Sequence, residues 1–149
     1  MKKQYVRKHL SPGRDGTSYY LDEKMTILHR EDGPAREYAD GDKFWYIDGL
    51  LHREDGPAVE NANGSKRWYF KGKLHRKDGP AAEDPDGHKE WLIHGKYHRE
   101  DGPTIEYADG STEWHLNDVL LTEEQVSEKL NEKLREMHKK KGRGIRTIR

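Results

Sequence analysis

The chain has 149 residues, and its 28 lysines and arginines balance 28 aspartates and glutamates. Charged residues make up 38 % and hydrophobic residues only 31 %, which argues against a thick two-layer core and favours a thin, aromatic-rich one. No apolar run approaches the ~18 residues that a membrane span needs, and the basic start lacks the apolar stretch of a signal peptide. With no cysteine in the sequence, we expect no disulfide or thiolate chemistry and a cytoplasmic location.

A 23-residue unit is repeated along the chain from His29 onward, and residues 1–28 resemble a degenerate copy of it. Asp15-Gly16 followed by Tyr20 imitates the glycine-to-tryptophan spacing of that unit. The distance from Gly16 to His29 is 13 residues, however, where the repeats have 11. We expect a degenerate capping repeat here, because the ends of repeat arrays need atypical units.

The 23-residue unit then recurs four times over residues 29–120, and eight columns carry one residue type in all four copies. Such recurrence indicates that the same supersecondary structure forms four times along the chain. Five of these eight aligned positions hold arginine, glycine (twice), proline and glutamate. The other three hold the histidines His29, His52, His75 and His98, the aspartates Asp32, Asp55, Asp78 and Asp101, and the tryptophans Trp45, Trp68, Trp91 and Trp114.

Each unit contains two turn signals with an alternating strand between them. The first is an Asx-Gly pair such as residues 40–41, in which both central residues tolerate positive φ, and the second is a pair such as residues 48–49. Trp45 and Ile47 share one parity of the strand, which predicts a half-buried face. The following Asp-Gly-Pro step ends the strand, because proline has no N–H to donate. We therefore expect a mainly β protein, an elongated antiparallel β-hairpin repeat array with a core of tryptophans.

The 23-residue period, the strand opening Gly-x-x-x-Trp, the x-x-Gly turn and the histidine after it resemble MORN-type repeats. The wording Leu-His-Arg-Glu-Asp-Gly-Pro-Ala of residues 51–58 is similar to a variant found in uncharacterised phage and bacterial proteins. The resemblance covers residues 29–120 and departs from the ordinary pattern at the Asp-Gly-Pro-Ala corner. It implies a hairpin array that mediates binding. For a phage-encoded chain it further implies an inhibitor of a host enzyme, toxin or defence protein in the host cytoplasm.

The repeated His-Arg-x-Asp motif is the candidate for a catalytic or metal-binding site, since His and Asp three residues apart can bind a metal or act as acid and base. Four near-identical copies do not make one asymmetric pocket, and each copy has too few ligands for structural zinc. A structural use is favoured, in which the aspartate caps the turn and the arginine pairs with it or with the recurrent glutamate. We therefore expect no enzyme activity, no metal and no cofactor.

Positions that differ between the units are the better candidates for recognition, because an array of identical scaffolds gains specificity where its copies differ. Net charge also varies, and the fourth unit reaches −5. The candidate partner-binding residues are Arg36, Tyr46, Arg67, Tyr69, His94 and His115.

A C-terminal helix is predicted over residues 121–141. Thr122 and Gln125 have the spacing of a capping box, and an apolar stripe runs from Val126 to Met137 at helical spacing. We expect this stripe to pack on the last repeat and cap the array. A helix that dimerises or binds a partner is the alternative.

The chain ends in a basic segment, of which residues 142–149 form a predicted tail. Its cations make it a candidate arm for nucleic acid or an acidic partner. Three hypotheses follow: a non-enzymatic protein-binding scaffold, which is favoured, a nucleic-acid-binding protein that uses the tail, and a self-associating structural protein that forms a homo-oligomer through the helix. No membrane partner is expected. The basic residues are Lys139, Lys140, Lys141, Arg143, Arg146 and Arg149.

Overall fold

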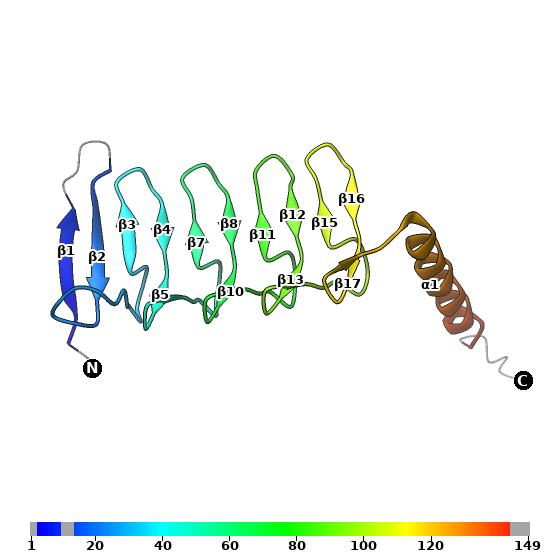
Figure 1. Cartoon of the computed structure of the whole chain (residues 1–149), viewed down its shortest axis with the longest axis horizontal. Helices are drawn as coiled ribbons and strands as arrows, with labels where there is room; N and C mark the ends of the chain where they lie inside the picture. Colours follow the sequence, from blue (N-terminus) through cyan, green and yellow to red (C-terminus); the bar gives the residue numbers. More distant parts are fainter. Residues whose placement is uncertain (1–2, 10–13, 144–149) are drawn as a thin grey trace, which may run out of the picture.

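The structure is a computed structural model that describes residues 3–9 and 14–143. Over these residues it is mainly β, with 18 short strands in antiparallel pairs and one helix. Figure 1 shows an elongated row of hairpins with the helix leaving its C-terminal end. The predicted fold class is confirmed.

Ten strands form one antiparallel sheet that runs the length of the row. It begins with a hairpin of β1 (Tyr5–His9) and β2 (Gly16–Tyr20). Each unit then adds one long hairpin, whose first strand pairs with the preceding unit. These hairpins are β3 (Arg36–Tyr38) with β4 (Lys43–Phe44), β7 (Val59–Glu60) with β8 (Lys66–Arg67), β11 (Ala82–Glu83) with β12 (Lys89–Glu90), and β15 (Ile105–Glu106) with β16 (Thr112–Glu113).

Each unit also contains a short hairpin, which lies at the opposite end of the unit from the tip of the long one (Figure 1). The strand around the tryptophan serves both hairpins, and the tryptophan belongs to neither pairing. Trp45 keeps its backbone bonds, because its N–H donates to the Ala58 carbonyl at 2.8 Å and its carbonyl accepts the His52 N–H at 3.0 Å. The short hairpins are β5 (Tyr46–Ile47) with β6 (Leu50–Leu51), β9 (Tyr69–Phe70) with β10 (Lys73–Leu74), β13 (Leu92–Ile93) with β14 (Lys96–Tyr97), and β17 (His115–Leu116) with β18 (Val119–Leu120).

The two turns of a unit are of different types. In the first long hairpin Gly41 has a φ of 104°, and the Asp40 carboxylate accepts the Asp42 N–H at 3.0 Å. This is a type I turn closed by a glycine bulge. Although both residues of the Asx-Gly pair tolerate positive φ, only the glycine adopts it here, and the aspartate contributes through its side-chain hydrogen bond to the backbone. The two positive angles lie instead in the short hairpin, at Asp48 (50°) and Gly49 (79°).

The most deeply buried column consists of small residues, and the tryptophans are only half-buried. The prediction that the tryptophans form the core is therefore wrong. Adjacent units approach to backbone hydrogen-bonding distance directly after the recurrent proline, which leaves room for a methyl group and not for an indole. The members of the buried column, each at most 1 % exposed, are Ala35, Ala58, Ala81 and Thr104.

The N-terminal unit follows the same plan with a tyrosine in place of the tryptophan. Tyr19 donates its N–H to the Ala35 carbonyl at 2.8 Å, and its carbonyl accepts the His29 N–H at 3.1 Å. These are the bonds that Trp45 makes in the first full repeat. The residue equivalent to tryptophan is therefore Tyr19, and Tyr20, which the glycine spacing suggests, is buried on the other side of the strand.

Helix α1 (Glu123–Arg143) begins at the predicted capping box. The Thr122 N–H donates to Oε1 of Gln125 at 2.9 Å, and the Gln125 N–H donates to Oγ1 of Thr122 at 3.3 Å. The helix ends two residues beyond its predicted end and includes Gly142. Within the described residues, no helix combines the length and the apolar character that a membrane crossing needs.

The helix contacts the last repeat through lysines. Nζ of Lys133 donates to the Asp101 carbonyl at 2.8 Å, and Nζ of Lys129 lies 6.0 Å from the centroid of the Trp114 ring. A carbonyl and an indole face are electron-rich, so they attract ammonium groups rather than leucines. The prediction that the apolar stripe caps the array is therefore wrong. Three of its four residues stay exposed, with Leu130 at 42 %, Leu134 at 51 % and Met137 at 50 %, while Val126 is half-buried.

Candidate partner-binding surface

The recurrent corner joins each unit to the unit before it. In the second unit the guanidinium of Arg53 lies over Trp45 of the first, 4.0 Å from the ring centroid. Nε of Arg53 donates to Asp55 at 2.8 Å. Nη1 donates to the Pro57 carbonyl at 3.1 Å and to Glu60 at 2.8 Å. The third and fourth units repeat this arrangement.

Glycine is needed at this corner because the arginine packs against it. A Cβ on Gly56 would lie 2.9 Å from Cζ of Arg53. The same guanidinium donates to Asp55 and holds the pKa of that carboxyl below its ordinary value. The charged groups of the corner thus interact with one another, as a structural role requires. Over the described residues, no group of three or more His, Cys, Asp or Glu side chains is arranged to hold a metal ion.

The recurrent histidine holds the short hairpin of its own unit through Nδ1, which accepts a backbone N–H from the turn. The imidazoles of His75 and His94 also lie 4.2 Å apart between ring centroids. Burial, the facing His94 and the Lys77 charge lower the pKa of His75. The hydrogen-bonded pairs are His29 with Asp48 at 2.9 Å, His52 with Lys71 at 3.0 Å, and His75 with His94 at 3.0 Å.

The fourth histidine is in a different setting. The side chain of His98 is 53 % exposed. Asp118, where the other units have glycine, accepts the Tyr97 N–H through its carboxylate at 2.7 Å. The last short hairpin is therefore tied to the preceding unit by a side chain, where a backbone N–H ties the others.

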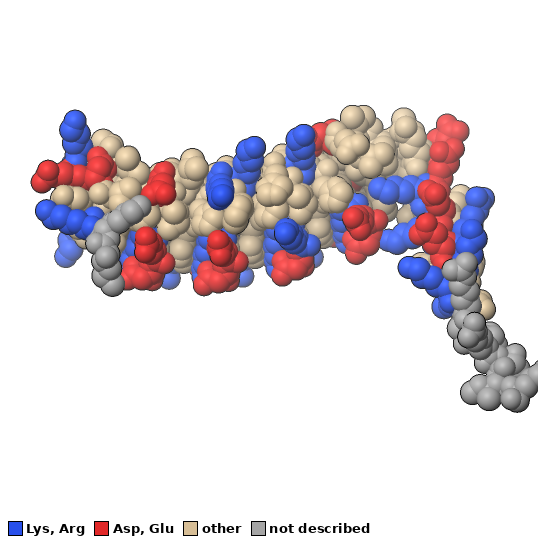
Figure 2. All heavy atoms as spheres, turned by 90° about the horizontal axis from the view of Figure 1, so that it is seen from below, with Lys and Arg blue, Asp and Glu red and all other residues tan. Residues whose placement is uncertain are grey.

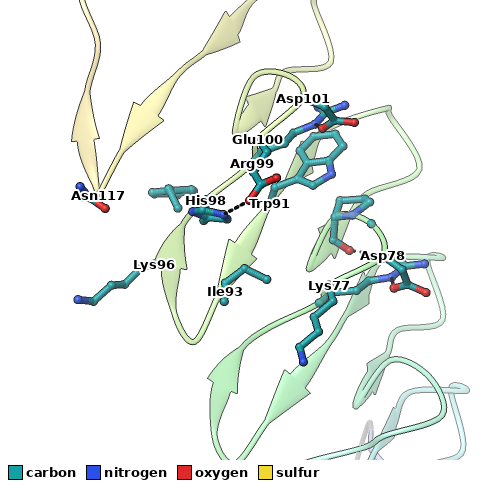
Figure 3. Close-up of a pocket in the computed structure, with 14 residues that line it drawn as sticks. Lys77, Asp78, Trp91, Ile93, Lys96, His98, Arg99, Glu100, Asp101 and Asn117 are labelled. Atoms are coloured by element: carbon teal, nitrogen blue, oxygen red, sulfur yellow. Dashed lines mark hydrogen bonds and ion pairs between the residues drawn. The ribbon is translucent and has the colours of Figure 1, made fainter. Parts of the chain in front are cut away.

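Successive corners leave three similar grooves between them, with volumes of about 720, 670 and 1000 Å³ from the N-terminal to the C-terminal one. Figure 3 shows the third, in which Arg99 lies beside Trp91 while Lys77 and Asp78 come from the preceding corner. Figure 2, seen from the side of the short hairpins, shows acidic side chains in clusters along one long edge. The repeated corner residues line all three grooves, but the remaining lining differs, with Glu31 and Glu54 in the first groove and Lys77 and Lys96 in the third.

One face of the ten-stranded sheet, here called the ladder face, carries an alternating row of glutamates and lysines. The corner arginines reach the glutamates from the same side. Residues of opposite charge stand opposite each other at each of these strand boundaries, which favours one register. The row, in cross-strand order, is Glu37, Lys43, Glu60, Lys66, Glu83, Lys89 and Glu106.

The opposite face, here called the variable face, differs from unit to unit, because side chains alternate between the two faces of a strand. Burial raises the pKa of Tyr46, and the charges of Arg36 and Tyr69 also act on it, so the short-hairpin tyrosines lie on this side as well. The row in register along the strands is Arg36, Phe44, Val59, Arg67, Ala82, Glu90, Ile105 and Glu113. Val59, Ala82 and Ile105 in this row are buried, so the charged and aromatic members are the ones a partner can reach.

The structure gathers most of the predicted recognition residues on the variable face. His115 joins them there, since its ring stacks on Tyr97 at 4.6 Å and its Nδ1 lies 2.7 Å from Oγ1 of Thr104. His94 is the exception, because it lies in a short-hairpin turn against His75. The residues that share this face, spread along the array from the first repeat to the fourth, are Arg36, Tyr46, Arg67, Tyr69 and His115.

Several side chains of the variable face hold one another in place. Nη2 of Arg67 donates to both carboxylate oxygens of Asp84, at 2.8 and 2.9 Å. The Tyr97 hydroxyl donates to Glu90 at 3.1 Å, and burial together with this carboxylate raises the pKa of Tyr97 to about 12. Side chains fixed in this way lose little freedom when a partner binds.

Asp84, Glu90 and Tyr97 are absent from the predicted recognition set. Strand parity is the signal that finds the first two, because each is one residue away from a position on the ladder face. Glu83 and Lys89 are those neighbours. Tyr97 follows from no sequence pattern, since its contact with Glu90 depends on how the short hairpin folds back.

The predicted basic arm is partly helical. Lys139, Lys140 and Lys141 are exposed on the last turns of α1, and Arg143 is its final residue. Arg146 and Arg149 lie outside the described residues.

A comparison with protein-family models, with curated proteins and with solved structures finds no significant match to this chain. The chemistry of its faces is therefore the basis for assigning a function.

Proposed function

We propose that the protein is a non-enzymatic scaffold that binds another protein through its variable face. The observation that carries the proposal is the division of the sheet: the recurrent glutamates and the lysines opposite them occupy the ladder face, and residues that differ between units occupy the other. The recurrent residues join the units. A face whose residues differ from unit to unit, carried on units that are joined by the same recurrent contacts, suits recognition of a particular partner.

The variable face also has a polarity along the array that a partner would match. Arg36 and Arg67 lie in its N-terminal half, and Glu90 and Glu113 lie in its C-terminal half. Tyrosines beside these charges offer rigid area with a polar end. We expect a folded partner whose charges run in the opposite order. The MORN-like resemblance supports this role, and its phage variant extends the proposal to an inhibitor of a host enzyme, toxin or defence protein.

The test is affinity capture from a cell lysate, followed by binding measurements with the purified partner. Tyr69→Ser on the variable face is compared with Lys66→Ser on the ladder face of the adjoining strand. We expect Tyr69→Ser to weaken binding at least tenfold, because tyrosine often carries a large share of interface energy. Lys66→Ser should bind as the unchanged protein does.

Equal binding by both variants would contradict the proposal, as would capture of nucleic acid alone with an affinity that falls steeply with salt. Circular dichroism of the two variants verifies that each retains the fold.

A further inference from the structure

Most of the apolar stripe of helix α1 is uncovered in the described chain. Leu130, Leu134 and Met137 are each between 42 % and 51 % exposed, whereas Val126 at its N-terminal end is half-buried. The helix is held to the last repeat by Lys129 and Lys133, which lie along one flank of the stripe, so the other flank, with Leu134, points away from the array. Leu116, Val119 and Leu120 in the preceding hairpin are 53–66 % exposed. This end of the molecule therefore has far more exposed apolar surface than the corners.

The stripe extends at both ends with the same spacing. Glu123 lies seven residues before Leu130, and Lys141 lies seven residues after Leu134. With Ser127 and Met137 between them, these positions alternate in steps of four and three, which is the spacing of a coiled-coil seam. The seam thus has a carboxylate and then a serine at its N-terminal end, three apolar residues in the middle and an ammonium at its C-terminal end.

We propose that a second copy of this chain covers the stripe, with the two α1 helices antiparallel. When Leu130 lies opposite Leu134 of the second copy, Glu123 lies opposite Lys141 of that copy, because the numbers in each pair have the same sum. The two-fold axis forms each pair twice. A parallel pair would set Glu123 against Glu123 and Lys141 against Lys141.

The charge pattern of the whole helix selects the same orientation. Its first turn is acidic, with Glu123 and Glu124, and its last turns contain Lys139–Lys141. Antiparallel alignment places the acidic end of one helix beside the basic end of the other. Three apolar residues per helix make a small interface, so the dimer should dissociate in the micromolar range. It uses a surface separate from the variable face, which stays available to a partner.

Sedimentation of the whole chain over a hundredfold range of concentration tests association. We expect the weight-average mass to rise from monomer to dimer, and Leu134→Glu to remain a monomer throughout. Arg135→Glu, one residue away and on another side of the helix, is the matched control and should dimerise like the unchanged chain. A monomer at every concentration, or equal loss of dimer in both variants, would overturn the proposal.

A charge exchange tests the orientation. Glu123→Lys and Lys141→Glu should each weaken the dimer about five- to tenfold, because each replaces two attractive pairs with two repulsive ones. The double variant restores both pairs and should dimerise like the unchanged chain. A double variant as weak as the single ones would exclude the antiparallel register. Helix content from circular dichroism, compared among all variants, verifies that α1 persists.

Discussion

At the scale of single residues, one guanidinium group joins two units at each boundary. Arg76 lies 3.9 Å from the centroid of Trp68 in the preceding unit, and it donates to Asp78, to the Pro80 carbonyl and to Glu83 within its own. The planar group can stack on a ring and donate in its plane at the same time, which an ammonium cannot do. This explains why the column contains only arginine.

Arg76→Lys is therefore expected to destabilise the array although it keeps the charge. Hydrogen bonds to carboxylates and the stacked contact are lost together, so the free energy of unfolding should fall by about 1–3 kcal/mol. Urea unfolding followed by tryptophan fluorescence measures the change. Arg135→Lys on the exposed face of α1 is the control, and an equal effect of both would show that the corner geometry is unimportant.

The pair of imidazoles at His75 and His94 predicts a loss of stability in acid. The folded protein lowers the pKa of His75, whereas the unfolded chain has the ordinary value of about 6.5. As pH falls through this value the unfolded state takes up the proton first, so the free energy of unfolding falls, by at most about 1.4 kcal/mol per pH unit for this group.

His94→Asn removes the facing imidazole and keeps a residue that tolerates the positive φ of this turn. Urea unfolding at a series of pH values between 5 and 8 should then show a shallower fall than in the unchanged protein. His138→Asn on the helix serves as the control. An unchanged slope in His94→Asn would mean that the imidazole pair does not cause the effect.

At the scale of elements, the corners fit against the preceding strands only because a small residue follows each proline. Ala58 is fully buried, and its carbonyl accepts the Trp45 N–H at 2.8 Å. A larger side chain must push the corner away from the strand and weaken that bond.

Ala58→Leu should therefore lower the free energy of unfolding by about 1–3 kcal/mol, the usual cost of an overpacked site. Ala108→Leu is the matched control, because Ala108 is exposed on the tip of a long hairpin. Denaturant unfolding measures the free energy of unfolding of both variants. An unchanged value for Ala58→Leu would show that the corner can move away from the preceding strand without loss of stability.

The sequence predicts the repeated elements well, because each turn and strand is marked by local residue types in four copies. The capping box at Thr122 and the corner contacts of the arginine column follow from short-range patterns of this kind. The full burial of Ala58 beside a half-buried Trp45 does not, since it depends on how closely two units approach. The docking of α1 through Lys129 also depends on a distant partner, the Trp114 ring.

Alternation along a single strand assigns neighbouring residues to opposite faces, and the sequence is enough for that, but which residues of different strands share a face depends on the register. Glu37 and Lys43 pair across the hairpin, and their neighbours Arg36 and Phe44 must then share the other face. What the sequence alone does not supply is this register, because the bulge at Gly41 shifts the pairing that a two-residue turn would give.

At the scale of the whole molecule, the array has no fifth arginine to cover its last tryptophan. Lys129 of the helix takes that place at Trp114, at the longer distance of 6.0 Å, and Lys133 bonds to the corner of the same unit. In repeat arrays each unit is stabilised by its neighbours, so the fourth unit should be the least stable of the four.

Hydrogen exchange should be slowest in β7–β12 and faster in β15–β18. Replacing Lys129 and Lys133 together with glutamine should accelerate exchange in the fourth unit and leave the second unchanged, because coupling acts between neighbours. Mass spectrometry of proteolytic fragments measures this, with Lys139→Gln as the control. A uniform acceleration along the array would show that it unfolds as one block.

The corner contact has a consequence for how such a chain can evolve. Each boundary between two full repeats uses the same joint, in which an arginine lies over the tryptophan that precedes it by eight residues, as Arg53 does over Trp45 and Arg76 over Trp68. If residues 52–74 were deleted, Arg76 would meet Trp45 at the same separation in sequence, with Asp78 and Glu83 still in place to receive its hydrogen bonds. Units of this design are interchangeable parts. Gene duplication or loss of a whole unit lengthens or shortens the readable surface while each joint that remains is left intact.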